Sequence, residues 1–151
     1  MSTYEYTGIN SSATVDFLAA ADLVEPKGIG LKITDSGVSL PTAGGDIAGI
    51  AIISNPDSVK AGERVDVQVK DIGLAKAGAA FNAGALLAVD ATGKFVAAAA
   101  GQLMIARALE TANAAGDLVK VQLINAGVGS ATVLAGAGSG SSSGDGANLG
   151  G

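Results

Sequence analysis

The sequence predicts an all-β fold, a compact barrel or sandwich built from two tandem repeats, and two observations lead to this expectation. First, valines alternate strictly with charged or polar residues over Arg64–Lys70, and the segment 119–123 alternates in the same way. A period of two is typical of a strand that buries one face in an antiparallel sheet. Second, three blocks of sequence recur in the same order, which indicates an internal duplication.

The duplicated blocks lie about 55 residues apart. Asp35 and Asp90 are separated by 55 positions, and each begins a turn between two short apolar segments. Glycine supplies positive backbone angles and Asp bonds nearby backbone, so Asp35-Ser36-Gly37 and Asp90-Ala91-Thr92-Gly93 predict hairpin turns. The matched blocks are, in chain order, 31–40 with 86–96, 46–52 with 103–109, and 62–69 with 116–123.

Two other segments are ambiguous between helix and strand. Ala97–Ala115 is rich in alanine and has helical propensity, whereas its counterpart in the first copy, Ile47–Ile53, is rich in β-branched isoleucine. Because two copies of one repeat share a fold, we expect Leu103–Leu109 to be a strand. Residues 13–24 fit either a short helix or a further strand, and the sequence leaves both open.

The chain divides into three parts by composition. Residues 1–30 contain Tyr4, Tyr6, Ile9 and Phe17, and we expect them to form an extended N-terminal arm. The duplicated β domain is predicted over 31–126, with repeats at about 31–73 and 86–126. Residues 127–151 form a tail rich in glycine and serine, a composition typical of flexible coil.

Composition and charge exclude several classes of function. The 151 residues suit one domain, and 9 Lys and Arg against 14 Asp and Glu give a net charge of −5. An acidic chain without a basic cluster gains little from phosphate neutralisation, so we expect no direct binding to nucleic acid. The absence of both Cys and His removes the usual thiol, imidazole and zinc chemistry. We therefore expect no enzyme activity, cofactor or metal. The start of the sequence and the shortness of its apolar runs also lead us to expect no signal peptide and no membrane-spanning segment.

One short motif favours an enzyme, and its second copy argues against that interpretation. Asp35-Ser36-Gly37 matches the signature of aspartic proteases, in which two such loops bring two carboxylates together. The second copy, Asp90-Ala91-Thr92-Gly93, carries an extra residue that would displace its carboxylate. We therefore interpret both motifs as turns, and we expect Asp35→Asn to change stability only slightly.

The apolar residues of the chain are mostly small. Only five residues are aromatic, so a core of Ala, Val, Ile and Leu buries less apolar area per residue than that of an average domain. We infer that part of the stability comes from self-association or from a large partner surface.

Turn-and-strand patterns over about residues 61–124 match a known group of proteins. They are found at Ala61–Val69, Ile72–Ala77, Ala83–Phe95, Ile105–Ala112 and Gly116–Leu123. Through these segments the chain resembles the small capsid cement, or head-decoration, proteins of tailed bacteriophages. It departs from their usual pattern at Ala106, where glycine is common, and at Val89, where an aromatic residue is common.

The resemblance implies a structural virion protein with a compact β-barrel domain. Such a protein forms trimers on the outer capsid surface and bridges neighbouring major capsid proteins. We expect Tyr4, Tyr6, Ile9 and Phe17 to contact the capsid or an adjacent subunit, since tyrosine is favoured at interfaces. Other virion modules, such as a head-fibre base or a tail-associated protein, stay open, and so does a glycan-binding module, which the lack of Trp disfavours.

Overall fold

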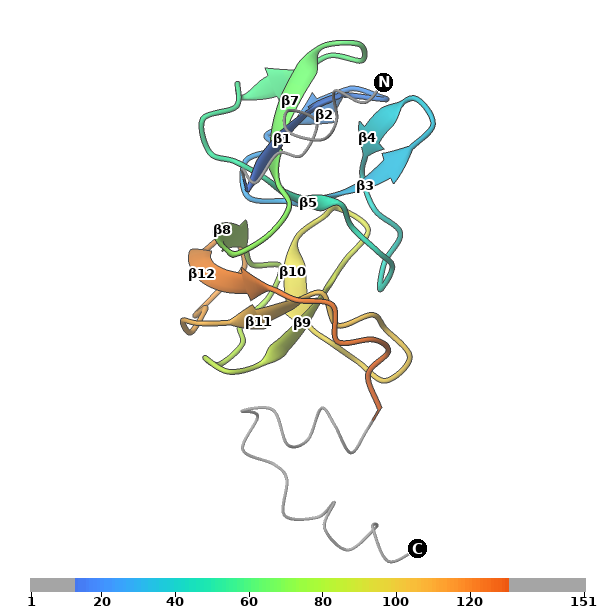
Figure 1. Ribbon diagram of the computed structural model, residues 1–151. Coiled ribbons are helices and arrows are strands. Elements are labelled where there is room, and N and C mark those ends of the chain that lie inside the picture. The colour runs from blue at the N-terminus through green and yellow to red at the C-terminus, as the bar shows by residue number, and fades with distance from the viewer. Residues whose placement is uncertain (1–12, 131–151) are drawn as a thin grey trace, which may run out of the picture.

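Strands account for all the regular secondary structure over residues 13–130, the part of the chain that the computed structural model describes (Figure 1). Twelve strands and no helix occur in this range, which confirms the predicted all-β class. The strands are β1 (Thr14–Leu18), β2 (Leu23–Val24), β3 (Gly30–Thr34), β4 (Gly37–Ser39), β5 (Gly49–Ala51), β6 (Ser58–Val59), β7 (Arg64–Gln68), β8 (Ile72–Lys76), β9 (Leu86–Val89), β10 (Phe95–Ala97), β11 (Ala106–Ala108) and β12 (Leu118–Leu123).

The strands form two five-stranded antiparallel sheets of the same topology, which appear as the upper and lower lobes of Figure 1. The first sheet has the order β1-β7-β5-β3-β4, and the second, read from its β8 edge, has the order β8-β12-β11-β9-β10. One parallel bridge joins the two outer strands of each sheet, Ala19 to Val38 in the first and Ala77 to Phe95 in the second. Each sheet therefore curls into a small barrel, and β2 pairs separately with β6.

Backbone hydrogen bonds recur at equivalent positions of the two sheets. The amide of Ala19 donates to the carbonyl of Glu63 and that of Ala77 donates to Asp117, both at 2.8 Å. The carbonyls of the same two alanines accept from Gly62 and Gly116, again at 2.8 Å. The predicted tandem β-repeats are thus present, each with a hairpin at its predicted Asp/Gly turn.

The strand equivalence places the start of each repeat earlier than the sequence suggested. Residues 14–24, expected within the arm, form β1 and β2, and this also settles the choice between helix and strand over 13–24. β1 pairs with β7 from Thr14 opposite Gln68 to Leu18 opposite Arg64. Its counterpart β8, whose first residues fell in the predicted first repeat, belongs to the second sheet. The other domain boundaries stay predictions.

Two further expectations concern the strand near Leu103 and the start of the tail. β11 occupies the centre of the predicted strand Leu103–Leu109. Residues 127–129, expected in the tail, are attached to the domain: Gly127 accepts from the amide of Met104 at 2.8 Å, and Gly129 donates to the carbonyl of Gln102 at 2.8 Å. Most of the predicted tail lies outside the described residues.

Each barrel encloses its own apolar core. Val65 and Val67 of β7 point into the first core, and Val119 and Val121 of β12 point into the second, as their alternation predicted. Ile50 lies in β5 of the first sheet but packs into the core of the second. The two cores are therefore in contact through this side chain.

Backbone groups of glycines join the two barrels. Gly30 donates to the carbonyl of Gly93 at 2.7 Å, Lys76 donates to the carbonyl of Gly28 at 2.7 Å, and Gly44 donates to Val89 at 2.7 Å. Gly93 has a φ of +84°, and a Cβ placed on it would lie 2.7 Å from the carbonyl oxygen of Gly30. Only glycine permits this close approach, so part of the high glycine content serves the joint between the repeats.

Candidate functional site

The acidic turn residues do not form a catalytic pair. The Asp90 carboxylate accepts hydrogen bonds from Thr92 and Lys94 of its own turn, with the two backbone amides at 2.8 and 3.1 Å. In the first hairpin the hydroxyl of Thr34, rather than Asp35, holds the turn by donating to the carbonyl of Gly37 at 2.9 Å. Over residues 13–130 no cluster of three or more His, Cys, Asp or Glu could hold a metal ion. The structure supports the interpretation of both motifs as turns.

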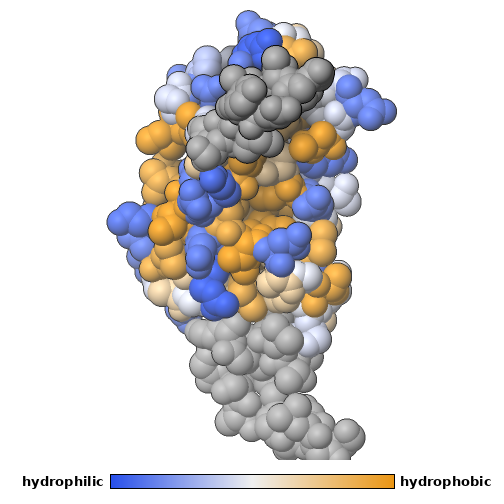
Figure 2. Space-filling view, viewed as in Figure 1, coloured by the Kyte–Doolittle hydropathy of each residue, from blue (hydrophilic) through white to orange (hydrophobic). Residues whose placement is uncertain are grey.

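The most prominent feature of the surface is apolar. Figure 2 shows hydrophobic side chains gathered across the middle of the visible face, between more polar groups. Large apolar side chains that are exposed are Leu18, Val24, Ile33, Leu40, Ile53, Ile72, Leu74, Leu109, Leu118 and Val128. None of the described residues forms a helix long and apolar enough to cross a membrane. Exposed apolar groups of this kind mark candidate interaction sites.

Three of these side chains line one groove, which we call the β5–β8 groove. Its volume is about 330 Å³. Ile52 and Ile53 follow β5, Ile72 and Leu74 come from β8, and buried Ile50 lies at its base. The remaining lining residues are Gln68, Gly73 and Lys120. The groove is thus an apolar hollow with a polar amide and one ammonium group on its wall.

The alternation of β8 explains why its large side chains face outward. Gly73 and Ala75 point into the second barrel and are buried, whereas Ile72 and Leu74 are 56% and 36% exposed. A Cβ on Gly73 would lie 2.8 Å from the side-chain oxygen of Gln68, so a larger residue at this position would displace the Gln68 side chain. The amide group of Gln68 in turn donates to the carbonyls of Lys70 and Ile72, which fixes the crossing from β7 to β8.

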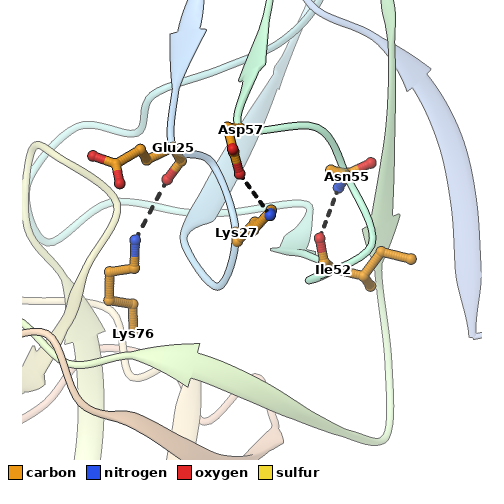
Figure 3. A network of polar contacts seen from close by, with 6 residues as sticks. All are labelled: Glu25, Lys27, Ile52, Asn55, Asp57 and Lys76. Atoms are coloured by element: carbon orange, nitrogen blue, oxygen red, sulfur yellow. Dashed lines mark hydrogen bonds and ion pairs between the residues drawn. The ribbon is translucent and has the colours of Figure 1, made fainter.

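A polar network holds the loop between the barrels beside this region (Figure 3). Lys27 forms an ion pair with Asp57 at 2.7 Å, and the ammonium of Lys76, in β8, donates to the carbonyl of Glu25 at 3.5 Å. The hydrogen bond from Lys27, together with its charge, lowers the pKa of Asp57 below its ordinary value. The contact of Lys76 connects β8 of the second sheet to the loop between β2 and β3, and the charged groups of the network lie on the surface.

Asp22 makes a similar contact on the first barrel. Its carboxylate accepts from the backbone amide of Ala61 at 2.9 Å and from the ammonium of Lys60 at 3.3 Å. The amide of Ala61 is the largest cause of the lowered pKa of Asp22, and Lys60 adds to it. Both contacts fix a surface turn and leave no unusual acid or base for catalysis.

Of the four contact residues predicted from the sequence, the structure describes only Phe17. Tyr4, Tyr6 and Ile9 lie outside the described residues. Phe17 lies in β1 opposite Val65, and its half-buried ring packs against the core of the first barrel. The β5–β8 groove was not predicted, although the order of large and small residues in Ile72-Gly73-Leu74-Ala75 could have indicated outward-facing apolar side chains.

Comparison with known proteins assigns this chain, which is all-β and presents apolar surface over residues 13–130, to a class of structural virion proteins. The phage cement protein family matches residues 9–123, and the chain belongs to this family. No curated protein matches the sequence. The sequence-based resemblance to capsid cement proteins is therefore confirmed, as is the expectation that the chain is not an enzyme.

A solved structure shares the fold. The head fiber gp8.5 N base of bacteriophage phi29 superposes with a TM-score of 0.58 at 16% sequence identity, covering 78% of this chain and 98% of that one. The protein is thus a phage cement protein of the virion capsid surface, with the two-barrel fold also seen in a head-fibre base.

Proposed function

We propose that the protein binds the outer surface of a phage head and stabilises contacts between neighbouring major capsid proteins. The observation that carries this proposal is the match to the phage cement protein family over residues 9–123, which includes both barrels. A cement protein adds contacts to an assembled capsid shell. The exposed apolar side chains of the domain supply surface that such contacts could bury.

The joint between the barrels supports a mechanical role. The backbone hydrogen bonds made by Gly28, Gly30 and Gly44 cross from one repeat to the other, and Ile50 packs across the same boundary. Force applied to one barrel can therefore pass to the other through backbone hydrogen bonds. A rigid unit of two barrels can hold two capsid subunits at a fixed separation.

The contact proposed from the sequence uses the N-terminal segment. Tyr4, Tyr6 and Ile9 combine apolar area with tyrosine hydroxyls, as interface residues often do. Phe17 already packs on the core of its own barrel, so its share in the contact is limited to the exposed part of its ring. We further propose a trimer, because three linked copies bind a lattice far more tightly than one when all can engage together.

The test uses phage heads purified without the protein. Full-length chain, a variant lacking residues 1–10, and the variant Asp35→Asn as a matched control are added to the heads, and occupancy and the heat stability of the heads are measured. We expect the full chain and Asp35→Asn to bind and raise heat stability, and the deletion to reduce occupancy. Full occupancy by the deleted chain contradicts the arm contact, and failure of the full chain to bind contradicts the function.

A second candidate function is that of a base for a head fibre. The likeness to the phi29 head-fiber base, which covers 98% of that chain, favours it. Imaging particles with and without the protein separates the two candidates. A density that lies flat at capsomer junctions supports cement, and a density that carries a projecting fibre supports the base.

A further inference from the structure

The β5–β8 groove combines apolar walls with an unused edge of backbone. Two backbone hydrogen bonds show which residues of β8 and β12 form hydrogen-bonded pairs. The amide of Ala77 donates to the carbonyl of Asp117 at 2.8 Å, and the amide of Leu123 donates to the carbonyl of Asp71 at 2.9 Å. Hydrogen-bonded pairs alternate along an antiparallel ladder, so the amide and carbonyl of Leu74 point away from β12. Neither group is hydrogen-bonded within the part of the chain that the structure describes.

The positions beside Leu74 on this edge are occupied. The carbonyl of Ile72 accepts from the Gln68 side chain, and the amide of Lys76 donates to the carbonyl of Gly28. The gap between these contacts is the site at which Leu74, Ile53 and Ile72 expose apolar surface. An exposed strand edge with apolar side chains around it accepts an extended peptide, whose backbone supplies the missing hydrogen bonds.

The N-terminal segment joins the described domain next to this groove. The carbonyl of Ala13 accepts from the amide of Val69 at 2.7 Å, and the neighbouring Gln68 lines the groove. Tyr6 lies seven positions before Ala13, and an extended chain of that length spans at most about 25 Å. The side chains of residues 4–9 can therefore reach the groove of their own chain.

The chemistry of the segment fits the groove. Thr3-Tyr4-Glu5-Tyr6-Thr7 alternates aromatic with polar residues and is rich in residues that favour strands. Two tyrosines at positions i and i+2 face the same side of a strand. An aromatic ring suits the isoleucine and leucine walls, and Gln68 and Lys120 can meet a tyrosine hydroxyl or the face of its ring.

We propose that in the free protein the segment Tyr4–Ile9 lies in the β5–β8 groove of its own chain, with a tyrosine ring between Ile53 and Leu74. Docking would cover apolar surface that otherwise promotes non-specific association. The inference concerns the protein before it meets a capsid and does not rest on the proposed function. Release of the segment on the head would free both the tyrosines and the groove for the shell.

Tyrosine fluorescence tests the proposal directly, because Tyr4 and Tyr6 are the only tyrosines and the chain has no tryptophan. Quenching by acrylamide is measured on the full chain and on Tyr4→Phe and Tyr6→Phe, each of which leaves one emitter. We expect at least one tyrosine to be quenched several-fold less than free tyrosine amide. Equal quenching of both tyrosines and the free amide overturns the proposal.

Variants with substitutions in the groove then show whether the groove is what protects the tyrosine from the quencher. Leu74→Asp and Ile53→Asp place a carboxylate in the groove, and Ile33→Asp is the matched control, since Ile33 is exposed in β3 and does not line it. We expect the groove variants to raise quenching to the level of the free amide and the control to leave it unchanged. Ile53 lies in a loop, so Ile53→Asp serves if Leu74→Asp does not fold by circular dichroism. Unchanged quenching in a folded groove variant overturns the proposal.

Dilution distinguishes the chain's own segment from that of a second copy. Protection within one chain is independent of protein concentration, whereas protection by a neighbour is lost on dilution. Constant quenching across a dilution series supports the proposal, and quenching that rises on dilution overturns it in favour of exchange between copies. Because no heads are present, the outcome is independent of the capsid-binding test.

Discussion

Asn55 is the most informative single residue for the stability of the first barrel. It is 5% exposed and the one buried polar side chain among the described residues. Its amide group donates to the carbonyl of Ile52 at 3.0 Å and of Asp66 at 2.9 Å, and its oxygen accepts from the amide of Asp66 at 3.0 Å. The side chain thus pairs with β7 as a further strand residue would.

Asn55→Ala removes these bonds and leaves the amide of Asp66 without a partner, whereas the carbonyl of Asp66 still accepts from the amide of Ile52 at 3.2 Å. An unsatisfied buried polar group costs about 1–3 kcal/mol, and we expect a loss of that size. At about 4 °C per kcal/mol for a domain of this size, the melting temperature should fall by about 4–12 °C. The measurement is urea unfolding followed by circular dichroism, with a thermal melt for comparison.

The second repeat supplies a matched control. Glu110 is 55 positions after Asn55 and accepts a single exposed hydrogen bond, from the amide of Lys120 at 2.7 Å. Because water can replace that bond, Glu110→Ala should cost less than about 1 kcal/mol. If Asn55→Ala costs no more than Glu110→Ala, burial of the Asn55 bonds does not stabilise the barrel and the reasoning is refuted.

Three further predictions concern the joint, the response to acid and assembly. Gly93→Ala should cost about 1–3 kcal/mol more than Gly116→Ala in urea unfolding, because both have positive φ but only the first meets backbone within 3 Å; equal costs would contradict the joint. The pKa values of Asp22 and Asp57 lie below the ordinary 3.8. A carboxyl group whose pKa is lower in the folded state stabilises that state at pH values above its unfolded pKa, and this stabilisation is lost as the pH falls through its folded pKa. The double variant Asp22→Asn/Asp57→Asn should therefore show a weaker dependence of the urea midpoint on pH below about pH 4. A dependence like that of the parent chain would exclude this contribution. If self-association stabilises the cores, which contain few aromatic side chains, the melting temperature should rise with protein concentration. A constant melting temperature across a hundredfold range of protein concentration would argue for a stable monomer.

The repeat could be predicted from the sequence because its signals are local. The valines of β7 and β12 alternate within one strand, and the Asp/Gly turns lie within one hairpin. β11 was correctly placed despite the helical propensity of its alanines, because its counterpart in the first copy is rich in isoleucine. Ala106 and Ala108 point into the second barrel, where their small side chains let the strands approach, so tertiary packing overrides their propensity.

The misplaced parts depend on pairing between distant segments. β1 shows no clear alternation of burial, since Val15 and Phe17 are only half-buried, and its identity as a strand comes from its pairing with β7. The groove was missed for a related reason. In β8 the larger side chains, Ile72 and Leu74, face outward, because Gly73 and Ala75 occupy the inward positions. Alternation of residues in the sequence predicts which face of a strand is buried only when the larger apolar side chains are the buried ones.

The glycines of this chain have two roles that composition alone cannot separate. A content of 23 glycines in 151 residues predicts flexibility, and the tail has the composition of flexible coil. At the joint, Gly28, Gly30 and Gly93 act in the opposite way, because the missing side chains let two backbones come within hydrogen-bonding distance. A side-chain interface of the same size would contain rotatable bonds that yield under load. For a protein proposed to hold capsid subunits together, backbone hydrogen bonds between the two barrels, together with the Ile50 side chain that packs across the joint, would limit movement of one barrel against the other.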